Sequence, residues 1–318
     1  MKPVPAINDA FVLSHRGKKN PVRPDRPYAW NIEKERTASG NLEDTATVFI
    51  TNSECPFHCL MCDLWKNTTD HPVGPGKVPA QIEWALKKLS PVKRIKLYNS
   101  GNFFDQRAIP EEDHHVIAQT LSRMDTVVVE THPRLVDERV LRFRDMLTGR
   151  LEIAMGLETV HPGAARLLNK RMTTDDFRKA AGFLRENEVS VRAFILLRPP
   201  FLSEEEGVEW AKKSIEFAFD CGVECCVVIP TRAGNGALEH LQEEGHFSPP
   251  TIFSLEEVLV WGVSLGRGRV FADLWDIEKF SSCDKCLRAR VERLDRMNHT
   301  QKVVEEIVCG CREWGPRK

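Results

Sequence analysis

Residues 47–62 read Thr-Val-Phe-Ile-Thr-Asn-Ser-Glu-Cys-Pro-Phe-His-Cys-Leu-Met-Cys. The first five residues form a short apolar and β-branched run, which is typical of a buried strand. Cys55, Cys59 and Cys62 follow at the spacing C-x3-C-x2-C. In a parallel α/β barrel the loops at the C-terminal ends of the strands build the active site. The sequence therefore predicts three thiols gathered at the mouth of such a barrel.

The chain beyond this loop alternates between strand and helix patterns. Five further strands are predicted, at residues 94–98, 126–130, 151–155, 191–197 and 224–229. Helical patterns lie between them, at residues 81–89, 115–123, 138–147, 164–168 with 175–186, and 204–219. Six strands that are each followed by a helix imply a parallel sheet with right-handed crossovers. Six units are two short of a closed barrel, so we expect an α/β fold with a partial, open (β/α)6 TIM-like barrel.

This barrel pattern occupies residues 46–275 and is flanked by two shorter regions. Residues 1–45 form an N-terminal extension that is rich in proline, and its first 40 residues carry eight basic and four acidic side chains. We interpret the extension as a solvated arm on the barrel, with a contact surface for an anionic substrate as the alternative. Residues 276–318 form a cysteine-rich C-terminal module.

Composition excludes several classes of protein. Of the 318 residues, 42% are hydrophobic and 29% are charged, which is ordinary for a globular chain and excludes a disordered or fibrous one. No apolar run approaches the ~20 residues of a membrane span, and the N-terminus lacks the apolar core of a signal peptide. Ten cysteines without such a signal indicate a reducing cytoplasm, where clustered thiols bind metal more often than they form disulfides.

The three cysteines of residues 55–62 favour an iron–sulfur cluster with one open iron. An electron carrier would supply a fourth cysteine to complete the coordination, but the next one along the chain is Cys221. This absence disfavours an electron-transfer protein. The alternative is a zinc knuckle in which His58 supplies the fourth ligand.

Residues 55–62 resemble the cluster loop of the radical S-adenosylmethionine (SAM) superfamily, with Met61 where that superfamily usually has an aromatic residue. The resemblance implies a [4Fe-4S] cluster on Cys55, Cys59 and Cys62, whose open iron chelates the amino and carboxylate groups of SAM. In that superfamily one electron, from a reductant such as flavodoxin or ferredoxin, cleaves SAM. The resulting 5′-deoxyadenosyl radical then abstracts a hydrogen from the substrate, which requires a site shielded from water.

Polar residues at the other strand ends are the candidates for contacts to SAM or substrate. Ser100, Gly101 and Asn102 follow the second strand, where the superfamily carries a Gly-Gly-Glu-like turn that holds the amino group of SAM. The glutamate of that turn is absent here.

The third, fourth and fifth strands end in Glu130, Glu158 and Arg198. A single polar residue at a strand end is equally well explained as a solvated rim residue, but several at equivalent ends indicate a site. We predict that these three side chains also contact SAM or substrate. No catalytic residue beyond the cluster ligands is identified.

Two close cysteine pairs, Cys283 with Cys286 and Cys309 with Cys311, indicate a second metal site. Four thiolates in two pairs are typical of structural zinc, and the same four could hold an auxiliary iron–sulfur cluster. Zinc is favoured, because a fully ligated site needs no reactivity. A helix is predicted between the pairs, at residues 287–308. Cys221, Cys225 and Cys226 are expected to pack as small apolar residues.

The likeness to the superfamily extends beyond the cluster loop, over roughly residues 45–314. The turn in residues 97–105, Gly-Leu-Glu-Thr at 156–159 and residues 196–204 look like the radical SAM group that contains the catalytic subunit of Elongator. The tail is similar too, with Asn-x2-Gln at 298–301 and Arg-Glu-Trp at 312–314 after the last cysteine. Within this group the chain looks most like the radical SAM subunits of archaeosine synthase. That resemblance implies action on a lysine-modified 7-deazaguanosine in tRNA, with radical cleavage of a side-chain bond.

Two functions of different classes are therefore weighed. The first is a radical SAM enzyme that transforms a modified nucleoside in tRNA or a free small molecule. The second is a zinc-dependent structural or RNA-binding protein without SAM chemistry. A net charge of −1 gives no independent support for an RNA substrate, whose phosphates normally meet a basic surface. Barrel enzymes change substrate by loop variation, so the fold alone does not specify one.

Overall fold

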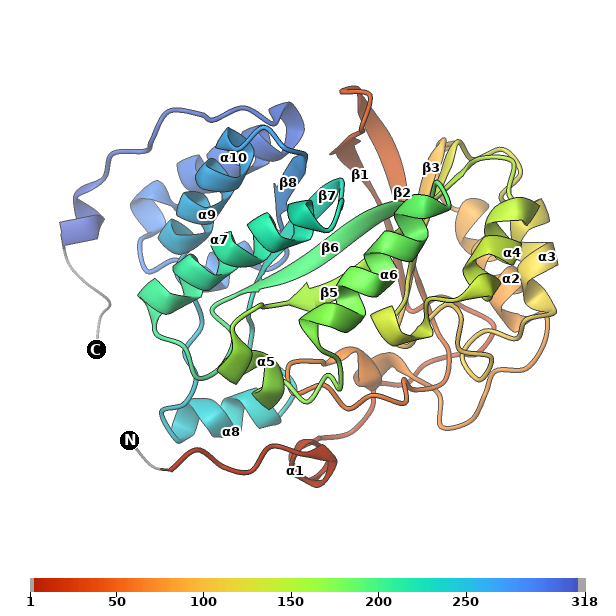
Figure 1. Cartoon of the computed structure of the whole chain (residues 1–318), viewed down its shortest axis with the longest axis horizontal. Helices are drawn as coiled ribbons and strands as arrows, with labels where there is room; N and C mark the ends of the chain where they lie inside the picture. The colour runs from red at the N-terminus through yellow and green to blue at the C-terminus, as the bar shows by residue number, and fades with distance from the viewer. Residues whose placement is uncertain (1–2, 314–318) are drawn as a thin grey trace.

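A curled sheet of eight strands, in the order β1 to β8, forms the centre of the protein (Figure 1). The computed structural model describes residues 3–313, so Trp314, part of the tail motif, lies outside the described residues. The strands are β1 (Ala29–Arg36), β2 (Leu42–Ile50), β3 (Arg94–Asn99), β4 (Thr126–Glu130), β5 (Arg150–Glu158), β6 (Ser190–Leu197), β7 (Cys225–Pro230) and β8 (Arg269–Ala272). Strands β2 to β8 are parallel, and β1 is antiparallel to β2.

The predicted α/β half-barrel is confirmed, and its six predicted strands are β2 to β7. Two further strands were missed. Residues 29–36 were expected in a solvated arm but form β1, and the sheet continues past β7 into the four-residue β8. Neither strand carries a long apolar run, because their inward side chains include charged residues such as Glu35 and Arg269.

Helices follow the strands and cover the sheet. They are α1 (Asp9–Ser14), α2 (Lys77–Leu86), α3 (Asp113–Thr120), α4 (Glu138–Met146), α5 (Pro162–Leu167), α6 (Thr174–Glu186), α7 (Glu204–Asp220), α8 (Ala237–Glu243), α9 (Ile252–Ser264) and α10 (Asp284–Thr300). Capping boxes start α6 at Thr173 and α7 at Ser203, which satisfies N–H groups that have no partner inside the helix. None of the described helices is both long and apolar enough to cross a membrane.

One face of the sheet is apolar and the other is charged. Along β3, Ile95 and Leu97 join the hydrophobic core under the helices, whereas Arg94 and Lys96 alternate with them and are also buried. Successive side chains of a strand point to opposite faces, so the charged side chains lie on the face away from that core. They are neutralised by carboxylates from other strands.

An ion pair between two distant strands shows how strongly the sheet curls. Arg192 of β6 donates two hydrogen bonds, of 2.9 and 2.7 Å, to the carboxylate of Glu35 on β1. Five inter-strand steps separate these strands, which in a flat sheet would place them about 24 Å apart. The pair therefore forms across the hollow of the half-barrel.

The C-terminal helix α10 covers the open edge of the sheet. The Asn298 side chain accepts the N–H of Ala272 and donates to its carbonyl, both at 2.9 Å. Gln301 does the same for Val270, at 2.7 and 2.9 Å. The Asn-x2-Gln motif thus replaces a neighbouring strand for β8, whose backbone would otherwise be an unpaired edge.

The range predicted for the C-terminal helix, residues 287–308, was wrong at its end. Helix α10 ends at Thr300, where Gln301 takes a left-handed conformation with φ of 51°. The chain then leaves the helix, and this departure returns residues 309–311 toward Cys283.

Candidate active site

The cluster loop, residues 55–62, joins β2 to α2 at the end of the half-barrel where the parallel strands finish. Burial raises the pKa of the Cys55 and Cys59 thiols and raises that of Cys62 to about 12. Thiols in such a position stay protonated in water but lose their protons to a coordinated metal.

The separation of cysteine sulfurs distinguishes a site for one metal ion from a site for a cluster. Four thiolates on one tetrahedral zinc ion lie about 3.8 Å apart, given metal–sulfur bonds of about 2.3 Å. Among the described residues, the four C-terminal cysteines meet that requirement, with sulfurs all within 4.8 Å of one another. Thiolates that bind three different irons of a cluster are spaced more widely than this.

His58 is engaged elsewhere, which weakens the zinc-knuckle alternative. Its Nδ1 lies 3.1 Å from Asp9 Oδ2 and its Nε2 lies 3.8 Å from Glu54 Oε1. The imidazole therefore contacts two carboxylates from outside the cysteine triad. The loop has no histidine aimed at a fourth coordination position.

Residues from distant parts of the chain hold the cluster loop in place. The N–H of Leu60 donates to Leu168 O at 2.9 Å, and Asn235 Nδ2 donates to Leu60 O at 2.7 Å. Asn169 Nδ2 donates to His58 O at 2.7 Å. The loop is thus fixed from the segments before α6 and before α8.

The N-terminal helix α1 lies beside α8 and covers the cluster loop (Figure 1). Leu60 is fully buried in a small apolar cluster with Val12 of α1 and Leu238 and Leu241 of α8. Asp9 at the start of α1 pairs with His58 and with Arg171. This cover keeps water from one side of the loop.

The turn after β3, residues 100–102, reaches the cluster loop through Asn102. Asn102 Nδ2 lies 3.3 Å from Cys55 Sγ, and Ser100 Oγ donates to Leu64 O at 2.7 Å. A Cβ on Gly101 would lie 3.1 Å from Asn52 Nδ2, so a larger residue would push on its neighbours.

Glu130 and Glu158 lie near each other and near Lys170. Glu130 Oε2 accepts the N–H of Asn99 at 3.2 Å, and burial raises the pKa of this carboxyl to about 8. Burial by itself lowers the pKa of Lys170, but its ion partner Glu158 and the nearby thiol of Cys59 raise it overall. A protonated lysine beside two carboxyl groups therefore faces the cysteine loop.

The backbone around Glu158 is strained in a way that serves this ion pair. Glu158 takes a left-handed φ of 64°, which costs energy for a residue with a side chain and is common at functional sites. A Cβ at Gly156 would overlap both the Glu158 carboxylate and Lys170 Nζ. The glycine of the Gly-Leu-Glu-Thr motif thus leaves room for the pair.

His132 adds a neutral aromatic ring beside the loop. It stacks on Phe57 with ring centroids 3.9 Å apart. Its Nδ1 accepts the N–H of Arg134, and its Nε2 lies 3.0 Å from Lys170 O, where it donates. Burial lowers the pKa of His132 to about 3, so it stays uncharged at neutral pH.

Arg198 is not brought together with the other predicted residues. Its Nη1 pairs with Glu204 at 2.5 Å and donates to Pro249 O at 2.8 Å. These contacts tie the end of β6 to the start of α7 and to the segment before α9. These contacts suit a role for Arg198 in positioning loops.

Sequence reasoning missed Lys170, His132, Asn169 and Asn235. Their neighbours along the chain are mostly loop residues, and no spacing rule connects them to the cysteines. The polar run Asn-Lys-Arg at residues 169–171, directly after a short predicted helix, was a local sign of Asn169 and Lys170.

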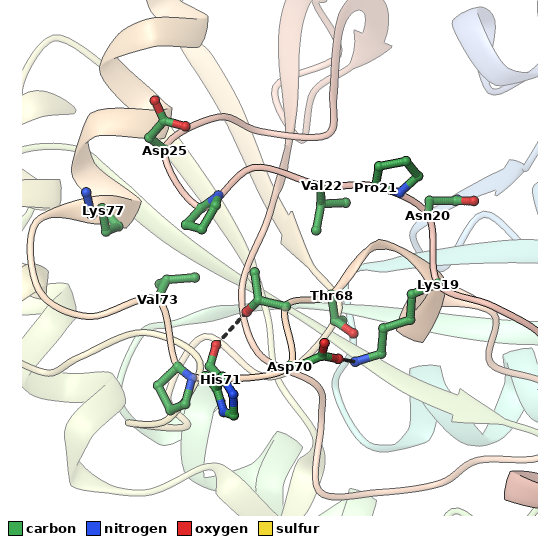
Figure 2. A pocket seen from close by; sticks show the side chains of 13 residues that line it. Lys19, Asn20, Pro21, Val22, Asp25, Thr68, Asp70, His71, Val73 and Lys77 are labelled. Carbon is green, nitrogen blue, oxygen red and sulfur yellow. Dashed lines mark hydrogen bonds and ion pairs between the residues drawn. The ribbon is translucent and has the colours of Figure 1, made fainter.

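A surface hollow of about 770 Å³ lies between residues 19–25 and 68–77 (Figure 2). Lys19 crosses it to Asp70 at 3.0 Å, and Thr69 donates to His71 O. The lining includes none of the predicted site residues, so this hollow is distinct from the candidate active site.

The four C-terminal cysteines converge as predicted. Cys283 Sγ lies 4.0 Å from Cys309 Sγ, and Cys286 Sγ lies 3.6 Å from Cys311 Sγ. Arg290 Nε donates to Cys286 Sγ at 3.3 Å, which is the kind of outer contact that orients a metal ligand. The donor set and spacing fit one tetrahedral metal ion.

Comparisons with known proteins place the chain in a family. No family model matches it. It is 30% identical over 268 residues to archaeosine synthase subunit beta of Methanosarcina acetivorans, covering 80% of this chain and 77% of that protein. The chain belongs to the archaeosine synthase subunit beta family. A second member, from Thermococcus kodakarensis, is 32% identical over 189 residues, covering 57% of this chain and 58% of that protein.

Two solved structures share the fold of this archaeosine synthase subunit beta family member. Elp3 of Methanocaldococcus infernus superposes with a TM-score of 0.52 at 16% identity, covering 72% of this chain and 56% of that one. Methylornithine synthase superposes with a TM-score of 0.54 at 15% identity, covering 77% and 68%. The chain thus spans little more than half of Elp3. The protein is a radical SAM enzyme, which confirms the resemblance seen in its cluster loop.

Proposed function

We propose that this radical SAM enzyme acts on a modified nucleoside within tRNA. The observation that supports this substrate most directly is the 30% identity to archaeosine synthase subunit beta over 80% of the chain. A substrate of that kind carries a long side chain on its base, which can extend toward a reactive centre at the mouth of a half-barrel. A free small molecule is the alternative substrate class.

Cys55, Cys59 and Cys62 would hold the [4Fe-4S] cluster, since their spacing suits three different irons. When bound there, the cluster supplies the electron that cleaves SAM into methionine and a 5′-deoxyadenosyl radical. Flavodoxin or ferredoxin is the class of partner that would deliver this electron.

Side chains beside the loop are suited to bind the amino-acid end of SAM, which carries one positive and one negative group. Lys170 offers a cation for the carboxylate, and Glu158 and Glu130 offer carboxyl oxygens for the ammonium group. Asn102 would line the same side through its contact to Cys55, with Ser100 and Gly101 beside it in the same turn. Helix α1 and its apolar contacts would exclude water from the radical.

An assay with anaerobically reconstituted, full-length protein tests this function. With SAM, dithionite and tRNA that carries a lysine-modified 7-deazaguanosine, we expect 5′-deoxyadenosine and a mass change in that nucleoside. Unmodified tRNA is the control and should give little of either product. If 5′-deoxyadenosine forms at the same rate with both tRNAs, the proposed substrate is wrong. If none forms under any condition, the proposed chemistry is wrong as well.

We also propose that residues 276–318 form a structural module around zinc. Support comes from sulfur separations of 3.6 and 4.0 Å, which are close to the ~3.8 Å of four thiolates around one zinc ion and too short for thiolates on separate irons. An auxiliary iron–sulfur cluster at these cysteines would need wider spacing.

Replacing Cys286 by serine should therefore remove zinc and leave the iron content unchanged. We expect zinc to fall from about one ion per chain to nearly none, because a closed structural site needs all four ligands. Mass spectrometry of the metals would measure both elements. Cys221→Ser, at a cysteine outside both sites, is the control and should keep its zinc. Iron lost in Cys286→Ser in place of zinc would identify an auxiliary cluster instead.

A further inference from the structure

Trp275 is the most exposed tryptophan among the residues that the structure describes, with 62% of its surface accessible. It lies three residues beyond the end of β8. Because β2 to β8 are parallel, this loop lies at the same end of the sheet as the cluster loop and the turn after β3. The exposed indole ring of Trp275 therefore packs against little of its own chain.

The backbone beneath this exposed ring is firmly bonded. Trp275 N donates to Asp273 Oδ1 at 3.1 Å, and Trp275 O accepts a hydrogen bond of 2.7 Å from Arg232 Nη2. The same guanidinium pairs with Asp273 at 2.7 Å and lies 5.6 Å from the ring centroid of Phe280. Arg232 and Asp273 thus fix the position from which the ring projects.

The loop that supplies Arg232 also holds the cluster loop. Three residues further on, Asn235 donates to Leu60 O at 2.7 Å and to Cys62 O at 3.4 Å. Three residues span at most about 11 Å. Lys66, beyond the last loop cysteine, donates to Gly234 O in the same segment. Trp275 is therefore fixed to the same short segment that anchors the cysteine loop.

We propose that Trp275 is a stacking platform for a nucleobase of the RNA substrate at the mouth of the half-barrel. This inference rests on the proposed function, because it names how the same site holds its tRNA. A flat, exposed ring on a backbone that is already fixed loses less entropy when a base stacks on it than a ring on a mobile loop would. Base–aromatic stacking tolerates any base, since every base has a π-face.

The surroundings of the ring favour a single base over a protein partner. Asp276 and Lys279 form an ion pair beside it, and Asp273 and Arg232 form another. Protein interfaces bury an apolar core depleted in charged residues, whereas one aromatic ring among charged groups suits one base next to a phosphate backbone. Base stacking of this kind would add RNA affinity that does not depend on a net positive charge.

Substitution of Trp275 in the full-length holoenzyme tests the proposal. We expect Trp275→Ala to weaken binding of the modified tRNA by about 5- to 150-fold at fixed salt, as loss of one base stack predicts. The KM for tRNA should rise by a similar factor, with a smaller change in kcat. Trp275→Phe retains an aromatic face and should stay within about 3-fold of the wild type.

Trp30→Ala is the matched control, because Trp30 is 39% exposed but packs on Trp84 of α2. It should bind the tRNA as the wild type does. Equal tRNA affinity in the wild type and Trp275→Ala, with both proteins folded by circular dichroism, would overturn this proposal alone. A wild type that neither binds nor modifies the tRNA would overturn the proposed function together with this inference.

Discussion

Replacing Cys59 by alanine should lower the formation of 5′-deoxyadenosine from SAM by more than about 100-fold. Loss of an outer contact to a metal ligand already costs about 10- to 100-fold in affinity or activity, and loss of the ligand itself removes more. Cys59 is the central member of the triad, and the loop offers no substitute ligand, because His58 contacts Asp9 and Glu54.

The measurement combines product assay with electron paramagnetic resonance of the reduced protein. In the wild type we expect addition of SAM to shift the cluster signal, and in Cys59→Ala we expect both the signal and the shift to disappear. Cys226→Ala is the control, because this cysteine is fully buried in β7 and away from the loop. A Cys59→Ala variant with normal product formation would show that the triad does not hold the cluster.

Replacing Arg192 by methionine should destabilise the fold by about 3 kcal/mol, at the lower end of the ~3–5 kcal/mol found when one partner of a buried ion pair is removed. Arg192 is 2% exposed and binds both Glu35 and Glu152. Without Arg192, these carboxylates keep ion pairs with Lys96, Arg94 and Arg269. These three cations limit the loss of stability, but none of them links β6 to β1 across the hollow of the half-barrel as Arg192 does.

The effect should also depend on pH. Burial alone raises the pKa of Glu35, but Arg192 and Lys96 outweigh it and hold that pKa well below the unfolded value of 4.5. A lowered carboxyl pKa contributes stability that is present above pH 4.5 and is lost as the pH falls through the folded pKa. The stability difference between the wild type and Arg192→Met should therefore be largest near pH 7 and shrink below pH 4.5.

Urea unfolding of the metal-free protein at several pH values measures this difference. Arg288→Met is the control, because Arg288 is 92% exposed and its ion pair is with Glu292, one helical turn away. Its effect should stay within about 0.5 kcal/mol. An Arg192→Met variant as stable as this control would mean that the buried charges are not needed to keep the sheet curled.

Strands β2 to β7 could be predicted because each has an apolar side that packs under helices, as Ile95 and Leu97 do. Strand β1 could not be predicted, because its inward residue Glu35 is polar and finds its partner Arg192 far along the chain. The pattern of apolar residues in a sequence predicts burial in an apolar core, but it does not predict burial in a network of ion pairs.

The chain by itself determined the chemistry that depends on local spacing, namely three thiols in the eight residues 55–62 and two pairs at the tail. Cysteine spacing within the loop and within each pair fixes which neighbouring sulfurs can reach one metal group. Only the tertiary structure decided which other residues meet there. The fold places Lys170 and Asn102 beside the cysteine loop. It pairs Arg198 with Glu204 instead. Curling of the sheet sets those contacts, because it joins strand ends that lie far apart along the chain.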